Sequence, residues 1–408
     1  MVQLQQLRLA PAAPMARAMR ALFLFNHDAG HQVAHLAGIA AATARLHRDI
    51  ATVVAYATPS IRTRLDQLIP AQDAARIRWE ELTLSGPQSW LAGPLDRLFP
   101  ASRLMRLRAH VDLFASADMI ISTERTCLRL KKHIDASQMP LFAKVPHGAG
   151  DRSVAYHPDY TRFDRSFVAG PKVVDQLVAH GVAREKLVIV GYPKFEGIDL
   201  EARPDFFDND RPTFVYNPHF DPNLSSWYDH GPDLLRWFAS SDGQAYNVVF
   251  APHVMLFKKE LHVSPEYRIA RKRPDVPAEA LAADNVLVAL DSPRLFDMSY
   301  TLGADAYIGD VSSQIYEFLL RPRPAFFIDA RRERLAEDDE WHLFWEAGPV
   351  AQSAADLTAL LPHFEAIGER HAARQKEIFS YTIDLGERPA SERAADAIAE
   401  AIRQKAGL

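Results

Sequence analysis

Histidines and paired serines directly follow four of the apolar runs in this sequence. The segments are His147-Gly148, Asn217-Pro218-His219, Pro252-His253 and Asp310-Val311-Ser312-Ser313. A histidine side chain titrates near neutral pH and suits proton transfer, whereas serine hydroxyls and backbone N–H groups at the start of a helix suit phosphate oxygens. If the runs are parallel strands, these residues lie beyond the carboxyl ends of the strands, where α/β sheets bind ligands. We therefore expect them to form an active site.

Each motif also has a structural interpretation. Asp310 or Ser312 is suited to capping a helix, and Gly148-Ala149-Gly150 lacks the third glycine of a dinucleotide-binding fingerprint. One histidine after a strand usually serves the fold, but three at equivalent positions favour a shared site.

His27 follows a further apolar run, at 21–25. His27, His31 and His35 are four residues apart and would share one face of a helix. No neighbouring Asp, Glu or Cys completes a zinc signature, and no acidic cluster offers a cage for a divalent cation. We therefore expect no metal and no cofactor, and keep His27 as a candidate substrate contact.

The elements that must position these residues are short, mostly continuous apolar runs, typical of parallel strands buried on both faces. They cover 21–25, 51–57, 118–122, 141–145, 165–169 and 187–190, and then 213–216, 247–251, 285–290, 305–308 and 325–328. The stretches 171–180, 226–238, 293–302 and 312–320 have helical spacing. Repeated strand–helix units predict an α/β architecture with parallel sheets.

A stretch rich in Pro, Gly and Asp, residues 192–212, separates the two sets of strands. It has little periodicity and is the best linker candidate. We expect two α/β domains, 1–195 and 196–408, with a cleft between them and a hinge in this stretch. Residues 356–408 are rich in Ala, Glu and Arg and are predicted to be helical, and they suit packing on either half.

Composition narrows the class of protein. The chain has 408 residues, 48% hydrophobic and 24% charged, which excludes disorder and allows two full cores. A formal charge of −5 argues against a dedicated nucleic-acid binder. The single cysteine, Cys127, fits a reducing compartment and is predicted to be a small buried hydrophobe. No run approaches the roughly 20 apolar residues of a membrane span, and we expect a cytoplasmic protein.

Residues 90–108 mix bulky apolar side chains with arginines, among them Arg97, Arg103 and Arg106. A basic amphipathic helix of this kind suits an anionic membrane surface, and it equally suits packing of its apolar face on a sheet.

As a set, the strand-end motifs resemble those of the CDP-glycerol glycerophosphotransferases, the polyol-phosphate transferases of teichoic-acid-type polymer synthesis. The resemblance covers roughly residues 140–330. It rests on His147-Gly148, on Gly191-Tyr192-Pro193-Lys194-Phe195, on His253, and on the spacing of Asp310-Val311-Ser312-Ser313 with Glu317. The family pattern differs at Ala149-Gly150, Phe195 and Glu317.

The resemblance implies a GT-B-like fold of two Rossmann-like domains, with the donor nucleotide held mainly by the C-terminal one. It also implies a lipid-linked or polymeric glycan acceptor reached from the inner face of the membrane, which favours a membrane contact through 90–108. The expected reaction transfers a polyol phosphate, most simply glycerol phosphate, from a CDP-linked donor to an acceptor hydroxyl, in the synthesis of a teichoic-acid or capsule polymer.

In this interpretation His147 is the general base and His253 assists catalysis by donating a hydrogen bond. Gly148, Asp310, Ser312, Ser313 and Glu317 bind the donor and its phosphates, and His27, Asn217 and His219 are candidate substrate contacts. Two other functions remain: a sugar transferase or nucleotide-sugar epimerase using a UDP-sugar, and a non-catalytic glycan- or nucleotide-binding partner of polymer export.

Overall fold

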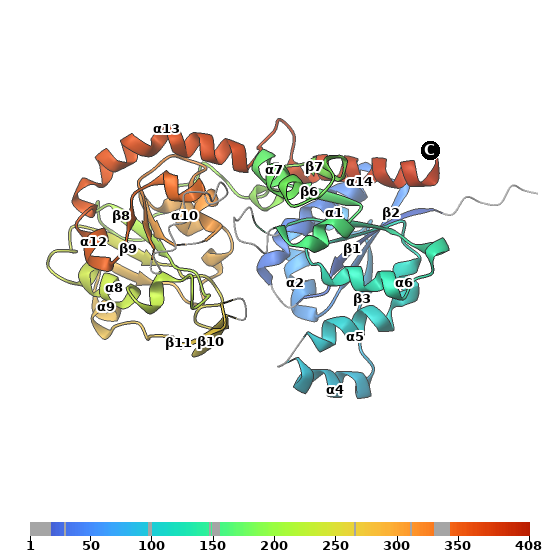
Figure 1. The fold of residues 1–408 in the computed structure, drawn as a ribbon, viewed down its shortest axis with the longest axis horizontal. Helices are drawn as coiled ribbons and strands as arrows, with labels where there is room; N and C mark the ends of the chain where they lie inside the picture. The colour runs from blue at the N-terminus through green and yellow to red at the C-terminus, as the bar shows by residue number, and fades with distance from the viewer. Residues whose placement is uncertain are drawn as a thin grey trace, which may run out of the picture.

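Two separate parallel sheets form the framework of the protein (Figure 1). The computed structural model describes residues 18–27, 30–96, 100–146, 148, 156–264, 267–310, 312–329 and 343–408. The first sheet has the strand order β3-β2-β1-β4-β5-β6-β7. Its strands are β1 (Met19–Phe25), β2 (Ile50–Tyr56), β3 (Arg78–Glu81), β4 (Met119–Ser122), β5 (Leu141–Lys144), β6 (Arg165–Val168) and β7 (Leu187–Ile189).

The second sheet has the order β12-β9-β8-β13-β14-β15 and is also parallel throughout. Its strands are β8 (Thr213–Asn217), β9 (Asn247–Phe250), β12 (Val286–Val288), β13 (Ala306–Gly309), β14 (Ala325–Ile328) and β15 (Val350–Ala351). An antiparallel ribbon, β10 (Leu261–Ser264) and β11 (Ile269–Lys272), stands apart from it. Two parallel α/β halves form a GT-B-like fold, which confirms the predicted fold class.

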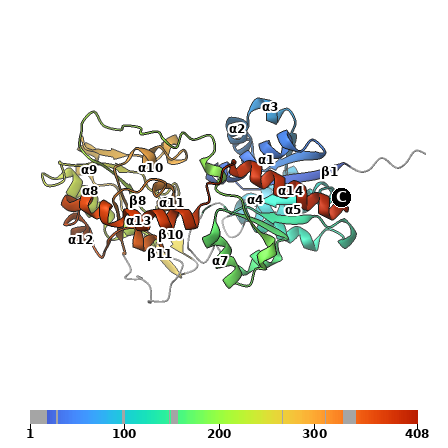
Figure 2. The ribbon, with the colours of Figure 1, turned by 90° about the horizontal axis from the view of Figure 1, so that it is seen from above.

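Helices cover the two sheets and connect their strands. They are α1 (Ala34–Leu46), α2 (Pro59–Leu68), α3 (Ala71–Ala74), α4 (Gly86–Leu95), α5 (Ala101–Ala109), α6 (Val111–Ala115), α7 (Pro171–Ala179), α8 (Gly231–Ala239), α9 (Ala278–Ala282), α10 (Ser299–Gly303), α11 (Gln314–Phe318), α12 (Ala354–Thr358), α13 (Phe364–Thr382) and α14 (Ala390–Ala406). Figure 2 shows α13 along the second half and α14 along the first.

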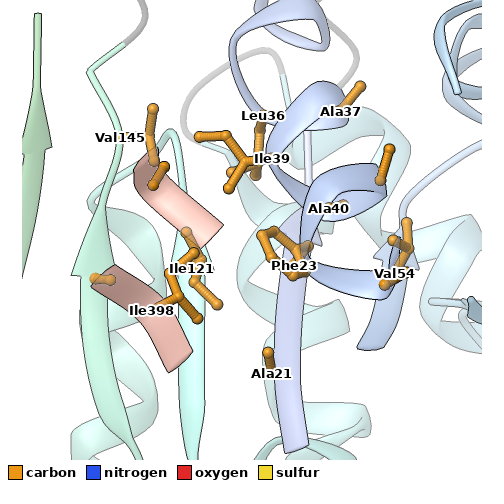
Figure 3. Close-up of a cluster of buried hydrophobic side chains, with 14 of the residues drawn as sticks. Ala21, Phe23, Leu36, Ala37, Ile39, Ala40, Val54, Ile121, Val145 and Ile398 are labelled. Atoms are coloured by element: carbon orange, nitrogen blue, oxygen red, sulfur yellow. The ribbon is translucent and has the colours of Figure 1, made fainter. Parts of the chain in front are cut away.

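The first half is completed by the last helix of the chain. Buried side chains of α14, among them Ile398, join the core formed by Phe23 of β1 and Ile39 of α1 (Figure 3). Ion pairs also tie this helix down: Arg403 contacts Asp49 at 2.9 Å. The expected division at 195/196 assigned all later residues to the second domain, and the position of α14 corrects this. The boundary near residue 195 stays a prediction.

The chain passes between the halves twice, at 190–212 and at 383–389. Two glycines of the first half and the first crossing allow close packing against the end of α13 and the second crossing. A Cβ at Gly170 would stand 2.5 Å from the Thr382 carbonyl oxygen, and one at Gly191 would stand 2.5 Å from that of Asp384. Gly191 also has φ +94°, a conformation that favours glycine. Within 190–212 the secondary structure is one short 3₁₀ turn, η7 (Pro193–Phe195).

The segment 90–108 is not one amphipathic helix, because it is divided between α4 and α5. Pro100 precedes α5, and a proline stops a helix by removing a backbone donor. Trp90 is 78% exposed, whereas Leu107 is buried in the core of the first half. Arg97 lies outside the described residues. Among the helices that the structure describes, none is long and apolar enough to cross a membrane.

Candidate active site

A cavity of about 970 Å³ lies between the two halves, lined by residues of both. Six predicted site residues line it: Gly148, His219, His253, Ser312, Ser313 and Glu317. They come from the loops after β5, β8, β9 and β13 and from α11, so the carboxyl ends of both sheets face the cavity. Three other predicted residues, His27, Asn217 and Asp310, do not line it. His147 lies outside the described residues, directly before Gly148.

His219 and His253 lie side by side in the cavity wall, with ring centroids 5.4 Å apart. Nδ1 of His219 accepts the backbone N–H of Asp221 at 3.0 Å, and Nδ1 of His253 accepts that of Met255 at 3.2 Å. Because a backbone N–H can only donate, each neutral ring carries its proton on Nε2. Both residues are therefore fixed as Nε2–H donors, which suits binding of phosphate oxygens and does not suit a general base.

Asp310 is fully buried and organises the loop that carries His219. Its carboxylate accepts the backbone N–H of His219 at 2.9 Å, and the N–H and hydroxyl of Ser226 at 2.7 and 2.8 Å. Desolvation raises the pKa of Asp310 to about 7, although these hydrogen bonds oppose the rise. Asp310 thus holds the cavity wall from behind and does not cap α11.

Asn217 has a similar supporting position. Its side-chain amide donates to the Ala251 carbonyl, at the end of β9, and its oxygen accepts the Ser312 hydroxyl at 3.4 Å. This links the ends of β8, β9 and β13. The predicted substrate contact of Asn217 is not favoured by this geometry.

Ser312 and Ser313 stand where the first half approaches the second. A Cβ on Gly148 would lie 3.4 Å from the Ser313 hydroxyl oxygen, in van der Waals contact, so the loop after β5 lies directly against this serine. Helix α11 has five residues, and the Ser313 side chain makes no cap hydrogen bond to it. The Ser312 hydroxyl, which donates to Asn217, also accepts the backbone N–H of Gln314, the first residue of α11, at 3.4 Å. Both serines line the cavity at the junction of the two walls.

Glu317 joins the halves through an ion pair. Its Oε1 lies 2.5 Å from Nζ of Lys194, in the crossing segment, and accepts the Tyr192 hydroxyl at 3.4 Å. The preceding residue, Tyr316, accepts a hydrogen bond from the buried Lys172 of α7 at 2.8 Å. Helix α11 is thus held at two consecutive positions, by α7 of the first half and by the crossing segment. The predicted contact of Glu317 with ribose stays untested.

The predicted histidine face at 27–35 does not form, because α1 begins at Ala34. His27 is fully buried, with Phe25 as a ring neighbour at 6.4 Å, and this burial argues against substrate contact. His35 is also buried, but it lines the cavity and contacts the ring of Tyr192 at 5.2 Å.

Sequence reasoning missed the cations of the first half's wall. Lys144, the last residue of β5, is 3% exposed and donates to the carbonyls of Thr123 and Val145. Desolvation lowers its pKa to about 8. Arg125 and His157 also line the cavity. The sequence did contain one sign of this wall: Lys144 ends a strand whose other residues are apolar.

Cys127 is buried behind this wall, and its thiol donates to the Glu124 carbonyl at 3.3 Å. Burial raises the pKa of the thiol to about 12, so it is no nucleophile at neutral pH. The prediction of a structural cysteine is confirmed.

The cavity is basic although the chain is acidic. Among its described lining residues, five carry a positive charge and three a negative one: Arg103, Arg125, Arg129, Lys144 and Lys194 against Glu124, Asp159 and Glu317. This balance favours an anionic ligand, such as a phosphate ester, in a protein with a net charge of −5.

No family model matches the sequence, and no curated protein sequence matches it either. Solved structures do match. The wall teichoic acid polymerase TagF superposes with a TM-score of 0.59 at 13% identity, over 96% of this chain and 90% of TagF. A TagF variant soaked with CDPG gives a TM-score of 0.58 at 14% identity over the same shares.

Two nucleotide-sugar epimerases are equally similar. A putative UDP-N-acetylglucosamine 2-epimerase from Listeria monocytogenes gives a TM-score of 0.59 at 12% identity, over 95% of this chain and 96% of that one. The UDP-GlcNAc 2-epimerase from Neisseria meningitidis, bound to UDP-GlcNAc, gives 0.55 at 13% identity, over 95% and 100%. At these identities the likeness shows the fold, and the chain therefore has the two-domain GT-B architecture of TagF and these epimerases.

Proposed function

We propose that this protein is a transferase that moves glycerol phosphate, or a related polyol phosphate, from a CDP-linked donor to a hydroxyl acceptor. The observation that carries the proposal is the pair His219 and His253, both fixed as Nε2–H donors in one basic cavity with Ser312 and Ser313. Hydroxyl and imidazole donors at the junction of two walls suit a pyrophosphate. The likeness to TagF supports the CDP-linked donor.

In the proposed reaction the acceptor oxygen attacks the phosphorus that carries the polyol. A new P–O bond forms, the bond to the bridging oxygen breaks, and CMP leaves with that oxygen and its negative charge. The acceptor proton passes to a general base, the role we propose for His147. Ser312, Ser313 and His253 stabilise the charge that develops on the phosphate oxygens, which is the main catalytic task in phosphoryl transfer.

We further propose that the donor nucleotide binds mainly to the second domain and that the domains close on it through a hinge at 192–212. This stretch contains no secondary structure beyond the short η7 turn, and its Lys194 pairs with Glu317 of α11; both observations support the idea. Limited proteolysis should cut the stretch, and CDP should slow the cut. Cleavage at an unchanged rate with saturating CDP would contradict closure.

For the acceptor we propose a lipid-linked or polymeric glycan, with weak membrane contact through α4 and α5. Trp90, 78% exposed, and the exposed Arg108 support this surface. Trp90→Ala with Arg108→Glu should abolish sedimentation with anionic vesicles, while Arg236→Glu on α8 should not. Binding that high salt leaves unchanged would contradict an electrostatic contact.

The test of the donor is a thermal-shift series with CDP, CDP-glycerol, UDP, UDP-N-acetylglucosamine and GDP. A ligand of the native state raises the melting temperature according to its affinity. We expect the CDP compounds to stabilise selectively, and CMP to be released from CDP-glycerol when an acceptor is present. Selective stabilisation by UDP compounds would overturn the proposal.

The second candidate is a UDP-sugar enzyme, a sugar transferase or 2-epimerase, favoured by the equal likeness to the epimerase structures. Turnover of UDP-N-acetylglucosamine without turnover of CDP-glycerol would establish it. A third, non-catalytic role in polymer export predicts donor binding with neither hydrolysis nor transfer.

A further inference from the structure

The cavity wall of the first half contains a group of nitrogen donors that the proposed catalytic residues do not use: Lys144, Arg125 and His157. Arg125 and His157 converge on one carboxylate: Nη1 of Arg125 lies 3.7 Å, and Nδ1 of His157 3.5 Å, from Oδ2 of Asp159. Lys144 lies beside them, with its ammonium 5.7 Å from the ring centroid of Tyr160. These residues come from β5, the start of η2 (Thr126–Lys132) and the start of η5 (Pro158–Arg162).

Among the described residues, the hydrogen bonds of these three side chains leave N–H groups that a ligand in the cavity can accept. Lys144 has three N–H groups and donates to two carbonyls, and no carboxylate in the part of the chain that the structure describes forms an ion pair with it. Nδ1 of His157 accepts the backbone N–H of Asp159 at 3.1 Å, so its neutral ring also carries the proton on Nε2. The Arg125–Asp159 contact is too long for a good hydrogen bond.

A buried ammonium needs a compensating charge. Transfer of a charged group out of water is costly unless it is paired, and lysines are almost never fully buried without a partner. Lys144 is 3% exposed at the edge of a cavity large enough for a nucleotide or a sugar phosphate. No carboxylate of the described residues pairs with this ammonium, and a dianionic phosphate in the cavity would do so, while Arg125 and His157 would contact its other oxygens.

We propose that Lys144, Arg125 and His157 form a second phosphate-binding site, in the wall opposite His219, His253 and the paired serines. The site takes a phosphoryl or phosphodiester group. The existence of the site does not depend on the proposed function, but the identity of its substrate does. Under that function the phosphate group belongs either to the donor diphosphate or to the acceptor. Because the two walls meet at Gly148 and Ser313, the site lies on the first half's side of this junction.

The test is calorimetric titration of Lys144→Met and Arg125→Gln with inorganic phosphate, glycerol 3-phosphate and CDP. The matched control is Lys132→Met, an exposed lysine on η2 that does not line the cavity. Arg125 is one-third exposed, so its variant tests the site even if Lys144→Met fails to fold. We expect the dissociation constants for phosphate and glycerol 3-phosphate to rise ten- to hundred-fold in both variants, with the control unchanged.

The three probes separate the sources of the phosphate. Weakened glycerol 3-phosphate binding with unchanged CDP binding assigns the site to the acceptor, and weakened CDP binding assigns it to the donor diphosphate. Unchanged binding of all three overturns the inference. If the wild-type chain prefers UDP to CDP, the proposed function fails, but the phosphate titration still decides whether this site exists.

Discussion

Replacing Lys144 by methionine should make the protein more stable at neutral pH and less able to bind anions. The pKa of Lys144 falls from 10.5 to about 8, chiefly through desolvation, against the opposing effects of Cys127 and Glu124 and with a further lowering by Arg125. A shift of this size costs about 3 kcal/mol of stability while the lysine is charged in the fold. Methionine removes that cost but leaves the Thr123 and Val145 carbonyls without their donor, at about 1 kcal/mol each. The net gain at pH 7 is about 1–2 kcal/mol.

The sign of the pH dependence follows from the same shift. Between pH 8 and 10.5 the unfolded chain holds a proton on this lysine that the folded chain has lost, so the wild-type free energy of unfolding rises with pH. The advantage of Lys144→Met should therefore shrink by about 2 kcal/mol between pH 7 and 9.5. Urea denaturation of both chains at pH 7, 8, 9 and 9.5 measures this difference.

The control for this experiment is Lys132→Met, which exchanges the same side chains at an exposed position. Its free energy of unfolding should stay within about 0.5 kcal/mol of wild type at every pH. A wild type more stable than Lys144→Met at pH 7, or a difference that does not change with pH, would refute the reasoning that burial makes the charge at this position costly.

Three further predictions concern the remaining site residues. His147→Ala should lower kcat by about 10²–10⁴-fold with little change in donor affinity, measured by CMP release and calorimetry, because it removes only proton transfer. Ser312→Ala with Ser313→Ala should raise the dissociation constant of the donor at least about ten-fold, because two hydroxyl contacts to charged oxygens are lost. The pKa of Asp310 is raised to about 7, so the wild-type free energy of unfolding should fall by about 4 kcal/mol as the pH rises from 4 through 7. In Asp310→Asn this fall should be absent, and urea denaturation of both chains across this pH range measures it.

Two results would contradict these predictions. Loss of nucleotide binding in His147→Ala, with binding retained in the double serine variant, would invert the two roles. A pH profile of stability shared by wild type and Asp310→Asn would show that this carboxyl is already ionised at pH 4 in the fold.

The sequence was most informative where histidine or serine residues directly follow an apolar run. All eleven predicted strands occur, because strands buried on both faces need continuous apolar residues, and His219, His253 and Ser312 meet because parallel strands end at one edge. The strand β3 was missed, since its sequence Arg-Trp-Glu-Glu is that of an exposed sheet edge.

Roles were harder to predict than positions. Asp310 follows a strand as a ligand-binding residue would, yet it points back to His219 and Ser226, a choice set by loops distant in sequence. His157 follows no strand and begins a short 3₁₀ helix, so its entry into the cavity depends on how that loop folds back. Burial of Lys144, likewise, depends on residues packed around it from other elements.

The return of α14 to the first half has a consequence for how the chain folds during synthesis. The core of that half stays open until α14 emerges, about 200 residues after β7. At 5–20 residues per second the ribosome needs roughly 10–40 s for that stretch, during which the side of α1 that α14 later covers stays exposed. The second half, whose strands and α13 are all made before α14, can form first. The N-terminal domain is thus the last to close, and a nascent chain arrested before residue 390 should expose a chaperone-binding surface on α1.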